Sequence, residues 1–327
     1  MSLYRAEISG PLKEDKMRPR IAETAKTLWL IYASLTLLCA FAYWLAGMSP
    51  FDAITHSFST VSIGGFSTHD SSMAYFNSPA VNLITVAFLL ISACNYALHF
   101  NAFSNLGKRN IFVSYFRDPE FRFFMFIQIA LVTICFFMLL TNHHFDGTFK
   151  NLEQAAFQSV SISTTAGYTT SSFDQWPLFL PILLLFASFI GGCAGSTGGG
   201  LKVIRILVLS LQGKRELKRL IHPNLVYPIK LGKRVLDERV IQSIWAFFSA
   251  YLLVFVVCLL GVISCGVETF DAFNAVIACL NNLGPGLGSV SSNFVSIPDS
   301  AKWILTLTMV CGRLEIFSLL VLSLIHI

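Results

Sequence analysis

Three short segments decide the fold of this chain: SIGGFS at residues 62–67, TTAGYT at 164–169 and NNLGPG at 281–286. They align without gaps on one glycine each, at Gly65, Gly167 and Gly284. An alanine stands twelve residues before each glycine, and in the first and third copies it closes the same tripeptide, Phe-Asp-Ala. Self-similarity of this kind is the signature of an internal repeat. The chain therefore contains three copies of one unit.

In each copy, the residues between the alanine and the glycine predict a short helix that runs toward the glycine. A helix of about ten residues cannot cross a hydrocarbon layer of about 30 Å, so it must enter the membrane and return. Non-helical backbone at membrane depth is tolerated only where it is buried in protein or lines a cavity. Glycine allows carbonyl groups to turn toward such a cavity, and carbonyl oxygens can replace the hydration shell of a monovalent cation. The repeat therefore predicts a cation filter; a tightly packed glycine turn is the alternative.

Composition places the chain in a membrane. Apolar residues make up 54% and charged residues 13% of the sequence, and the mean hydropathy is +0.66, whereas about 25% of a soluble domain is charged. Six spans are expected, and the last of them contains Arg313 and Glu315. The expected spans are 27–46, 79–103, 123–141, 176–194, 244–264 and about 303 to the end.

The distribution of lysine and arginine predicts the orientation. Segments 1–26, 104–122 and 202–239 hold 6, 4 and 10 of the 23 basic residues, whereas the alternate segments hold only Lys150 and Lys302. Because cytoplasmic loops are enriched in lysine and arginine, we expect a multi-pass protein with a cytoplasmic N-terminus. The predicted divisions are a basic linker at 1–26, pore repeats at 27–103, 123–205 and 240–327, a cytoplasmic loop at 104–122 and a basic segment at 206–239.

Two features inside the membrane are candidates for a gate. Residues 191–200 contain six glycines, which cannot sustain a stable helix. A phosphate-binding loop does not fit, because Gly200 is followed by Leu201 and Lys202 rather than by the Walker sequence; close glycine packing in a lipid-facing helix is an alternative. Arg313 lies at a depth where a charge is expensive unless it faces a cavity or a partner, and a structural salt bridge is its alternative.

Other classes of function are poorly supported by the residues. No span carries two carboxylates, a Ser/His pair or a bis-histidine arrangement, so we expect no enzyme. The histidines lack a third ligand at metal-binding spacing, and we read the eight cysteines as packing residues. A transporter with inverted repeats does not fit, because every short helix enters from the same side. No partner is expected among nucleic acids.

Nearly the whole chain resembles the Trk/Ktr/HKT potassium transporter superfamily, most closely its bacterial Trk members. The resemblance is carried by LYRAEISGPLKEDKMRPRIAETAKTLW, SIGGFSTHD, TTAGYTT, GGCAGSTGGGLK, NNLGPG and GRLEIFSLLVL. It implies an all-α integral membrane protein in which helix, re-entrant pore loop and helix units form a pseudo-fourfold, potassium-channel-like pore. It also implies potassium as the substrate, since a glycine in each filter copy goes with potassium preference in this family, and no covalently bound cofactor. Sodium or non-selective cation transport is the alternative.

The resemblance also assigns sites. The implied potassium-binding filter residues are Ser62, Ile63, Gly64, Gly65, Thr164, Thr165, Ala166, Gly167, Asn281, Asn282, Leu283 and Gly284. The implied gate residues, in and beside an intramembrane loop below the filter, are Gly191, Gly192, Gly195, Ser196, Thr197, Gly198, Gly199, Gly200, Lys202 and Arg313.

The resemblance further implies a bacterial inner membrane location, a homodimer and a cytosolic nucleotide-binding regulatory subunit, TrkA. The basic residues of 202–239 could form its docking surface, or they could contact anionic lipid. Family members carry a first repeat ahead of the basic linker, and the ending SLIHI does not match theirs. We therefore expect a truncated or mis-assembled gene product, a fragment that lacks the first repeat and does not necessarily conduct. The sequence leaves open whether transport is channel-like or proton-coupled.

Overall fold

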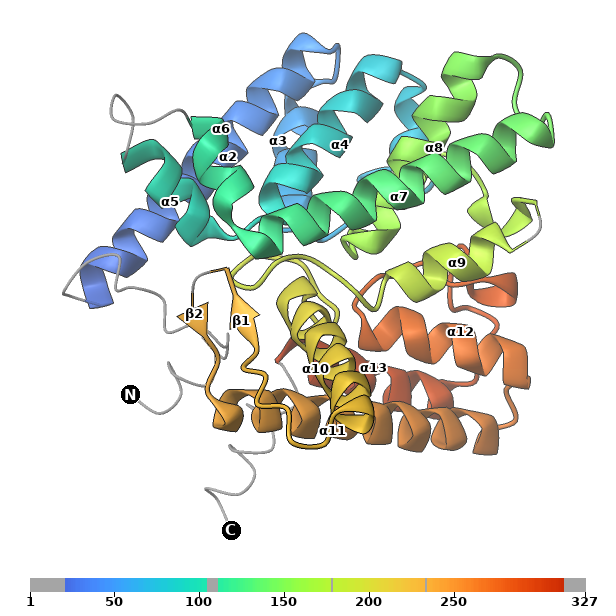
Figure 1. Cartoon of the computed structure of the whole chain (residues 1–327). Helices are drawn as coiled ribbons and strands as arrows, with labels where there is room; N and C mark the ends of the chain where they lie inside the picture. The colour runs from blue at the N-terminus through green and yellow to red at the C-terminus, as the bar shows by residue number, and fades with distance from the viewer. Residues whose placement is uncertain (1–20, 105–110, 178, 233, 315–327) are drawn as a thin grey trace.

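The computed structural model describes residues 21–104, 111–177, 179–232 and 234–314 (Figure 1). Most of the basic linker, the middle of the 104–122 loop, Glu315 and the SLIHI ending lie outside these residues. Within them the regular secondary structure is helical except for one small hairpin, and turns and loops join these elements.

The three repeats have the same order of elements. The first contains α2 (Ile21–Leu45), α3 (Pro50–Val61), η1 (Ser72–Phe76), α4 (Pro79–Ser92) and α5 (Tyr96–Ser104). The second is preceded by α6 (Ile111–Arg117) and contains α7 (Pro119–Thr141), α8 (Thr148–Ser163), η2 (Phe173–Gln175) and α9 (Leu180–Ala187). The third contains α11 (Glu238–Ser264), α12 (Thr269–Leu280), η3 (Gly288–Val290) and α13 (Asp299–Arg313).

In every repeat the first long helix packs against the short helix that follows it: α2 against α3, α7 against α8 and α11 against α12. Figure 1 shows α3 enclosed by α2 and α4, and α12 and α13 lying along α11. The predicted class, an all-α membrane protein of three re-entrant helix repeats, is confirmed. The antiparallel hairpin of β1 (Lys230–Leu231) and β2 (Arg234–Val235) was not predicted.

Local sequence signals start the helices. Proline occupies the first turn of α3, α4 and α7, where its missing N–H costs nothing. The hydroxyl of Ser49 accepts the N–H of Asp52 at 3.1 Å at the start of α3. Asp118 and Asp237 cap α7 and α11 in the same way. A side-chain acceptor at this position satisfies a backbone donor that the helix leaves unpaired.

The structure contains long apolar helices at some of the expected spans and shorter or bent helices at others. Helices 25–45, 119–141 and 238–264 are long and apolar enough to cross a membrane. The span expected at 79–103 is formed by two helices, α4 and α5, which meet at a bend of 91°. The span expected at 176–194 is an α-helix only over Leu180–Ala187. In the described part of the last span, α13 ends at Arg313, so the count of six stays a prediction.

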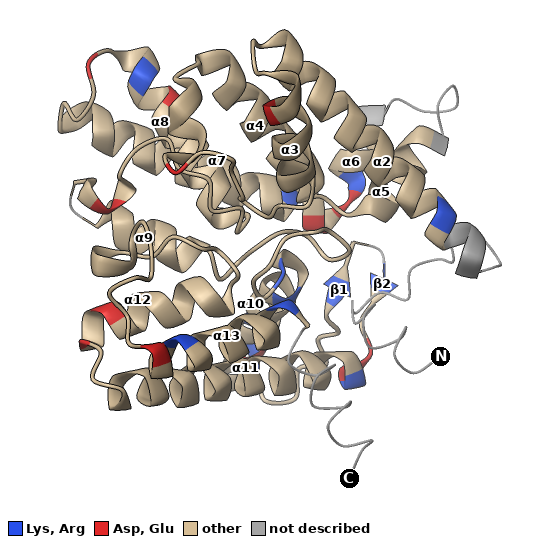
Figure 2. Cartoon of the chain, turned by 180° about the vertical axis from the view of Figure 1, so that it is seen from behind, with Lys and Arg blue, Asp and Glu red and all other residues tan. Residues whose placement is uncertain are grey.

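The basic segment carries α10 (Val203–Ile221) and the hairpin, and Figure 2 shows lysine and arginine gathered on these elements. Not all of this charge faces outward. Arg215 is buried, and its two terminal nitrogens donate to both carboxylate oxygens of Glu238 at 2.5 and 3.1 Å. This bidentate pair raises the pKa of the Arg215 guanidinium and fixes α10 against the start of α11.

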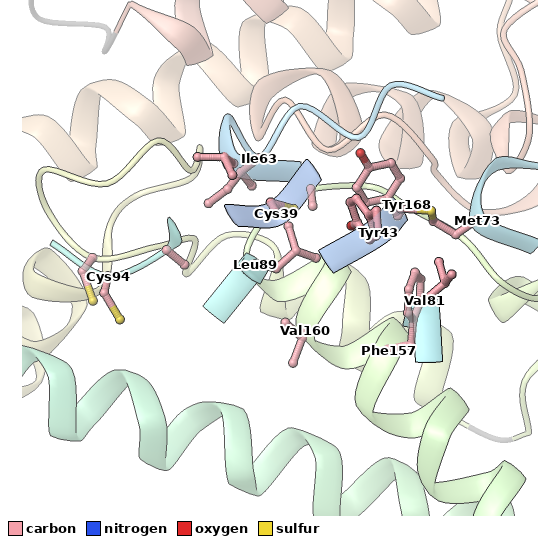
Figure 3. Close-up of a cluster of buried hydrophobic side chains, with 14 of the residues drawn as sticks. Cys39, Tyr43, Ile63, Met73, Val81, Leu89, Cys94, Phe157, Val160 and Tyr168 are labelled. Carbon is pink, nitrogen blue, oxygen red and sulfur yellow. The ribbon is translucent and has the colours of Figure 1, made fainter. Parts of the chain in front are cut away.

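Buried apolar side chains of the first two repeats form one core, which includes Tyr43, Leu89, Phe124 and Phe157. Figure 3 shows Tyr43 and Tyr168 side by side in this core. Since Tyr168 directly follows Gly167, the core reaches the predicted filter.

Candidate ion pathway

The three short helices end in the same hydrogen-bonded turn. In the first copy the N–H of Gly64 donates to Ser59 O at 2.7 Å, and that of Ile63 donates to Thr60 O at 3.1 Å. The second and third copies repeat both bonds, with N–H donors at Ala166, Thr165, Leu283 and Asn282 and distances of 2.8, 3.0, 2.8 and 3.1 Å. This pair of bonds is the Schellman motif of helix C-termini. The repeat found in the sequence is therefore a repeat of backbone geometry.

The turn places non-glycine residues in the left-handed region. The φ angles of Ile63, Thr165 and Asn282 are 54°, 69° and 56°. For β-branched residues such as isoleucine and threonine this conformation is a genuine outlier, and it costs about 1–3 kcal/mol. Strain of this kind persists only where the surrounding structure determines the backbone, and it clusters at functional sites.

Glycine is required where neighbouring filter segments approach each other. A Cβ atom on Gly65 would lie 1.8 Å from Ala166 O, and one on Gly167 would lie 1.8 Å from Leu283 O. Both glycines also have positive φ angles, of 67° and 81°. The three segments thus pack backbone against backbone, first against second and second against third.

One cavity is lined by all three segments. Of the predicted filter residues, all but Thr164, Thr165 and Asn281 line it. Those three have buried side chains that face the protein instead. Lys302 and Arg313 also line the cavity, so two basic residues of the last repeat share it with the predicted filter.

A network of hydroxyl groups supports the filter from behind. Tyr43 OH bonds to the hydroxyls of Thr60 and Thr85 at 2.8 and 2.9 Å, and Thr60 bonds in turn to Tyr168 OH at 3.2 Å. Ser161 donates to Tyr168 O at 2.8 Å. The network ties α2, α3 and α4 to the second filter segment, and sequence reasoning missed it.

Replacing Tyr43 by phenylalanine should lower the stability of the chain. The change leaves the buried hydroxyls of Thr60 and Thr85 each without one partner, and such a loss costs about 1–3 kcal/mol. Thermal unfolding of the purified protein in detergent should show a midpoint lower by several degrees. Tyr75→Phe is the control, because Tyr75 is 59% exposed. An equal shift in both variants would contradict the network's role.

The predicted gate loop lies between α9 and α10 and is not helical. Gly191, Gly195 and Gly200 have φ angles of 69°, 70° and 73°, which favour glycine. Close packing also requires glycine at position 199, because a Cβ atom on Gly199 would lie 2.3 Å from Asn281 O. A Cβ on Gly191 would lie 2.1 Å from Gly199 O. The loop is thus folded tightly on itself and against the third filter segment.

The tip of the loop, residues 196–199, contacts the ends of the short helices. Thr197 Oγ1 donates to Val61 O at 2.9 Å. The N–H of Gly199 donates to Thr165 Oγ1 at 2.7 Å. The predicted gate therefore touches two filter-bearing turns through side-chain hydroxyls.

Two cationic side chains hold the carbonyl groups of the tip. Arg313 Nη1 donates to Thr197 O at 3.2 Å. Lys202 Nζ donates to Ser196 O at 3.3 Å and also to Gly198 O. The structure thus brings Arg313 to the glycine loop and Lys202, although Arg313 is 116 positions from Thr197 in the sequence. A structural salt bridge is not observed for Arg313 among the described residues.

Negative charge is fixed at the opposite end of the first short helix. Desolvation alone would raise the pKa of the Asp52 carboxyl, but hydrogen bonds from Thr68 and Ser49 and the charge of His69 lower it below its ordinary value. His69 Nε2 lies 3.2 Å from Asp52 Oδ1. In the described part of the chain, no three histidine, cysteine or acidic residues are placed to hold a metal ion.

Sequence reasoning also missed Glu120 and the side-chain contacts of Asn281, which was predicted only as a filter residue. Asn281 accepts from Tyr251 OH at 2.5 Å and donates to Ser188 Oγ at 2.8 Å, which links the third filter segment to the end of α9. Glu120, in the first turn of α7, accepts the N–H of Ala194 at 2.6 Å. A carboxylate at the start of an apolar span was the available signal for Glu120.

The fold and this site define an integral membrane protein with repeated re-entrant pore loops that meet at one cavity. The family model for TrkH, described as a cation transport protein, matches residues 1–327. The chain belongs to this family.

Similar proteins include two that are named Trk system potassium uptake protein TrkH. The protein from Vibrio parahaemolyticus is 64% identical over 322 residues, and that from Escherichia coli K12 is 62% identical. The crystal structure of the potassium transporter TrkH from V. parahaemolyticus matches with a TM-score of 0.89 and 60% identity, covering 97% of this chain and 69% of that one. Both alignments to the curated relatives cover 98% of this chain but 66% of the relative, so the chain spans just under two thirds of their length.

Proposed function

We propose that this chain forms part of a pathway for potassium uptake across the bacterial inner membrane. The observation that carries the proposal is the threefold Schellman turn, which brings three glycine-containing filter segments to one cavity. Potassium is the substrate in this proposal, and no covalent cofactor takes part. The names of the relatives, which describe potassium uptake, support the choice of ion. The lysine and arginine distribution supports a cytoplasmic N-terminus.

The proposed gate is the glycine loop together with Lys202 and Arg313. A fixed positive charge beside the filter raises the barrier to a passing cation, and the loop tip lies against the same turns. Opening would require the tip to leave its bonds to Val61 and Thr165. The soft backbone of the loop makes it the part of the pathway best suited to move.

Regulation and assembly belong to the same proposal. A TrkA-type cytosolic subunit would dock on the basic segment, where Lys214 and Lys218 are exposed, and two copies of the protein would form a homodimer. Arg215 would not take part in docking, because it is buried against Glu238.

Complementation of potassium-uptake-deficient cells tests the function. Two forms should be compared: this chain alone, and this chain joined to the segment that its relatives carry beyond the matched two thirds. Growth at low potassium with the longer form is expected. Rescue by neither form, with both present in the membrane, would overturn the proposal. Rescue by the longer form only would show that the matched part needs the rest of the pore wall.

A further inference from the structure

The neck of the glycine loop, residues 191–195 together with 201–204, is held by a buried carboxylate. Glu120 is 2% exposed, and its Oε1 accepts the N–H of Ala194 at 2.6 Å. The backbone N–H of Ile204 also faces this carboxyl group and favours its charged form. Ala194 lies on the incoming limb of the loop, and Ile204 lies in the first turn of α10. One side chain of α7 therefore bridges both limbs.

Backbone bonds join the same two limbs and attach them to a neighbouring element. Val203 N donates to Gly192 O at 3.0 Å, and Leu201 N donates to Phe189 O at 2.8 Å. Cys193 N donates to Ala93 O at 2.8 Å, in the break between α4 and α5. Backbone bonds thus join the two limbs of the neck and attach it to the residues that follow α9 and to the break between α4 and α5.

Opposing electrostatic effects act on the Glu120 carboxyl group: its burial disfavours the charged form, whereas the positive end of α10 favours it. Glu120 lies at the N-terminus of α10, where the helix dipole and free N–H groups stabilise negative charge. Lys202 attracts it, whereas Asp118 repels it. Removing the side chain would leave the partly buried N–H of Ala194 without this acceptor, and donors that lose their partner away from water are costly.

The tip is held in a different way. Outside residues 191–200, its partners are Thr165 and Val61, each through one bond that involves a hydroxyl group, and the long side chains of Lys202 and Arg313. Side chains with many rotamers can follow or release a moving carbonyl, whereas the bonds at the neck join the ends of helices. The two parts of the loop therefore differ in how freely they can move.

We propose that Glu120 is a positioning residue of the gate: it clamps the neck of the glycine loop, so that opening moves the tip and leaves the neck in place. This inference rests on the gating role proposed above for the loop. It assigns to α7, which carries none of the predicted gate residues, a direct part in the gate.

The native thiol of Cys193 can report on the neck. Cys193 is 2% exposed, and its side chain contacts that of Cys94. In a chain with the other seven cysteines replaced by alanine, labelling by a water-soluble methanethiosulfonate measures exposure of the neck. Glu120→Ala should raise the labelling rate roughly tenfold, as expected when a local opening equilibrium loses one hydrogen bond that holds the closed form. Glu120→Gln, which keeps an acceptor oxygen, should restore most of the protection.

Gln128→Ala is the matched control. Gln128 is on the same helix and equally buried at 2%, but its Oε1 accepts from Ser163 on α8 rather than from the loop. Its loss should leave Cys193 protected. No increase in Glu120→Ala, or an equal increase in Gln128→Ala, would overturn the clamp.

A reporter at the tip keeps the test decisive if Glu120→Ala fails to fold. The tip reporter is a chain in which Cys193 is also replaced by alanine, so that Thr197→Cys supplies its cysteine. This cysteine should be labelled roughly tenfold faster than Cys193 is labelled in the chain that retains Glu120 and Thr197, since opening free energies vary locally. Equal rates at tip and neck would overturn the proposal.

Labelling does not depend on transport, so the two proposals can fail separately. In the complementing form, Glu120→Ala should change the rate of potassium uptake but not the ratio of potassium to sodium uptake, because the filter is untouched. A changed ratio would contradict a gating role. If the complementing form took up no potassium even with Glu120 in place, the proposed transport function would be contradicted. The labelling result on the neck of the loop would still hold.

Discussion

Gly167→Ala is expected to abolish the preference for potassium over sodium in the complementing form of the protein. The new Cβ would lie 1.8 Å from Leu283 O and 3.0 Å from Pro285 Cδ, so the second and third filter segments must separate. Overpacking of this kind costs about 1–3 kcal/mol, and the left-handed conformation adds about 1–2 kcal/mol for a residue with a side chain. Tracer uptake of rubidium and sodium should show the selectivity ratio falling by at least tenfold, the change that about 1.4 kcal/mol produces.

Gly47→Ala separates backbone strain from close approach. Gly47 has a φ of 98°, but a Cβ placed there would meet nothing within 4 Å. The variant should lose some stability and keep its selectivity. If Gly47→Ala reduced selectivity as strongly as Gly167→Ala, backbone contact between filter segments would not be the source of the preference. Retained selectivity in Gly167→Ala would contradict the filter assignment itself.

The repeat could be predicted because its signals are local. Glycine spacing, the alanine before each short helix and the apolar flanks all act within about fifteen residues, which is the range over which helix-forming and turn-forming preferences operate. The same locality allowed the glycine loop to be recognised, since six glycines in ten residues exclude a helix whatever surrounds them. The strained turn at Ile63 and Thr165 was not foreseeable, because isoleucine and threonine disfavour left-handed backbone.

What could not be predicted depends on contacts between distant residues. Glu120 meets a loop 74 positions away, and Thr60 meets Tyr168 across 108 positions. Each residue taken alone resembles an ordinary polar side chain of a membrane helix. The bend of 91° after α4 has no proline or glycine at Ser92–Asn95 to announce it. In the folded chain, Ala93 O at this bend accepts from the gate loop, so the helix break is coupled to tertiary structure.

Arg313→Ala is expected to raise the rate of potassium uptake in the complementing form. Arg313 lines the cavity of the filter segments and donates to Thr197 O at 3.2 Å, so the variant removes both a repulsive charge and a bond that holds the loop tip. Two unit charges 4 Å apart interact by about 4 kcal/mol at an effective dielectric constant of about 20. A fraction of that barrier is enough for a tenfold change in rate, which requires about 1.4 kcal/mol.

Charge and loop contact can be separated by two further variants. Arg313→Lys keeps the charge and should stay close to the parent rate, whereas Arg313→Gln keeps a hydrogen-bond donor and should resemble alanine if charge dominates. Lys202 still holds Ser196 O and Gly198 O in each of them, so Lys202→Ala combined with Arg313→Ala should raise uptake beyond the sum of the single changes. Uptake that is unchanged or lost in Arg313→Ala, at normal expression in the membrane, would contradict the gate. A strictly additive double variant would instead mean that the two cations act on the ion independently, and not through the loop tip that they share.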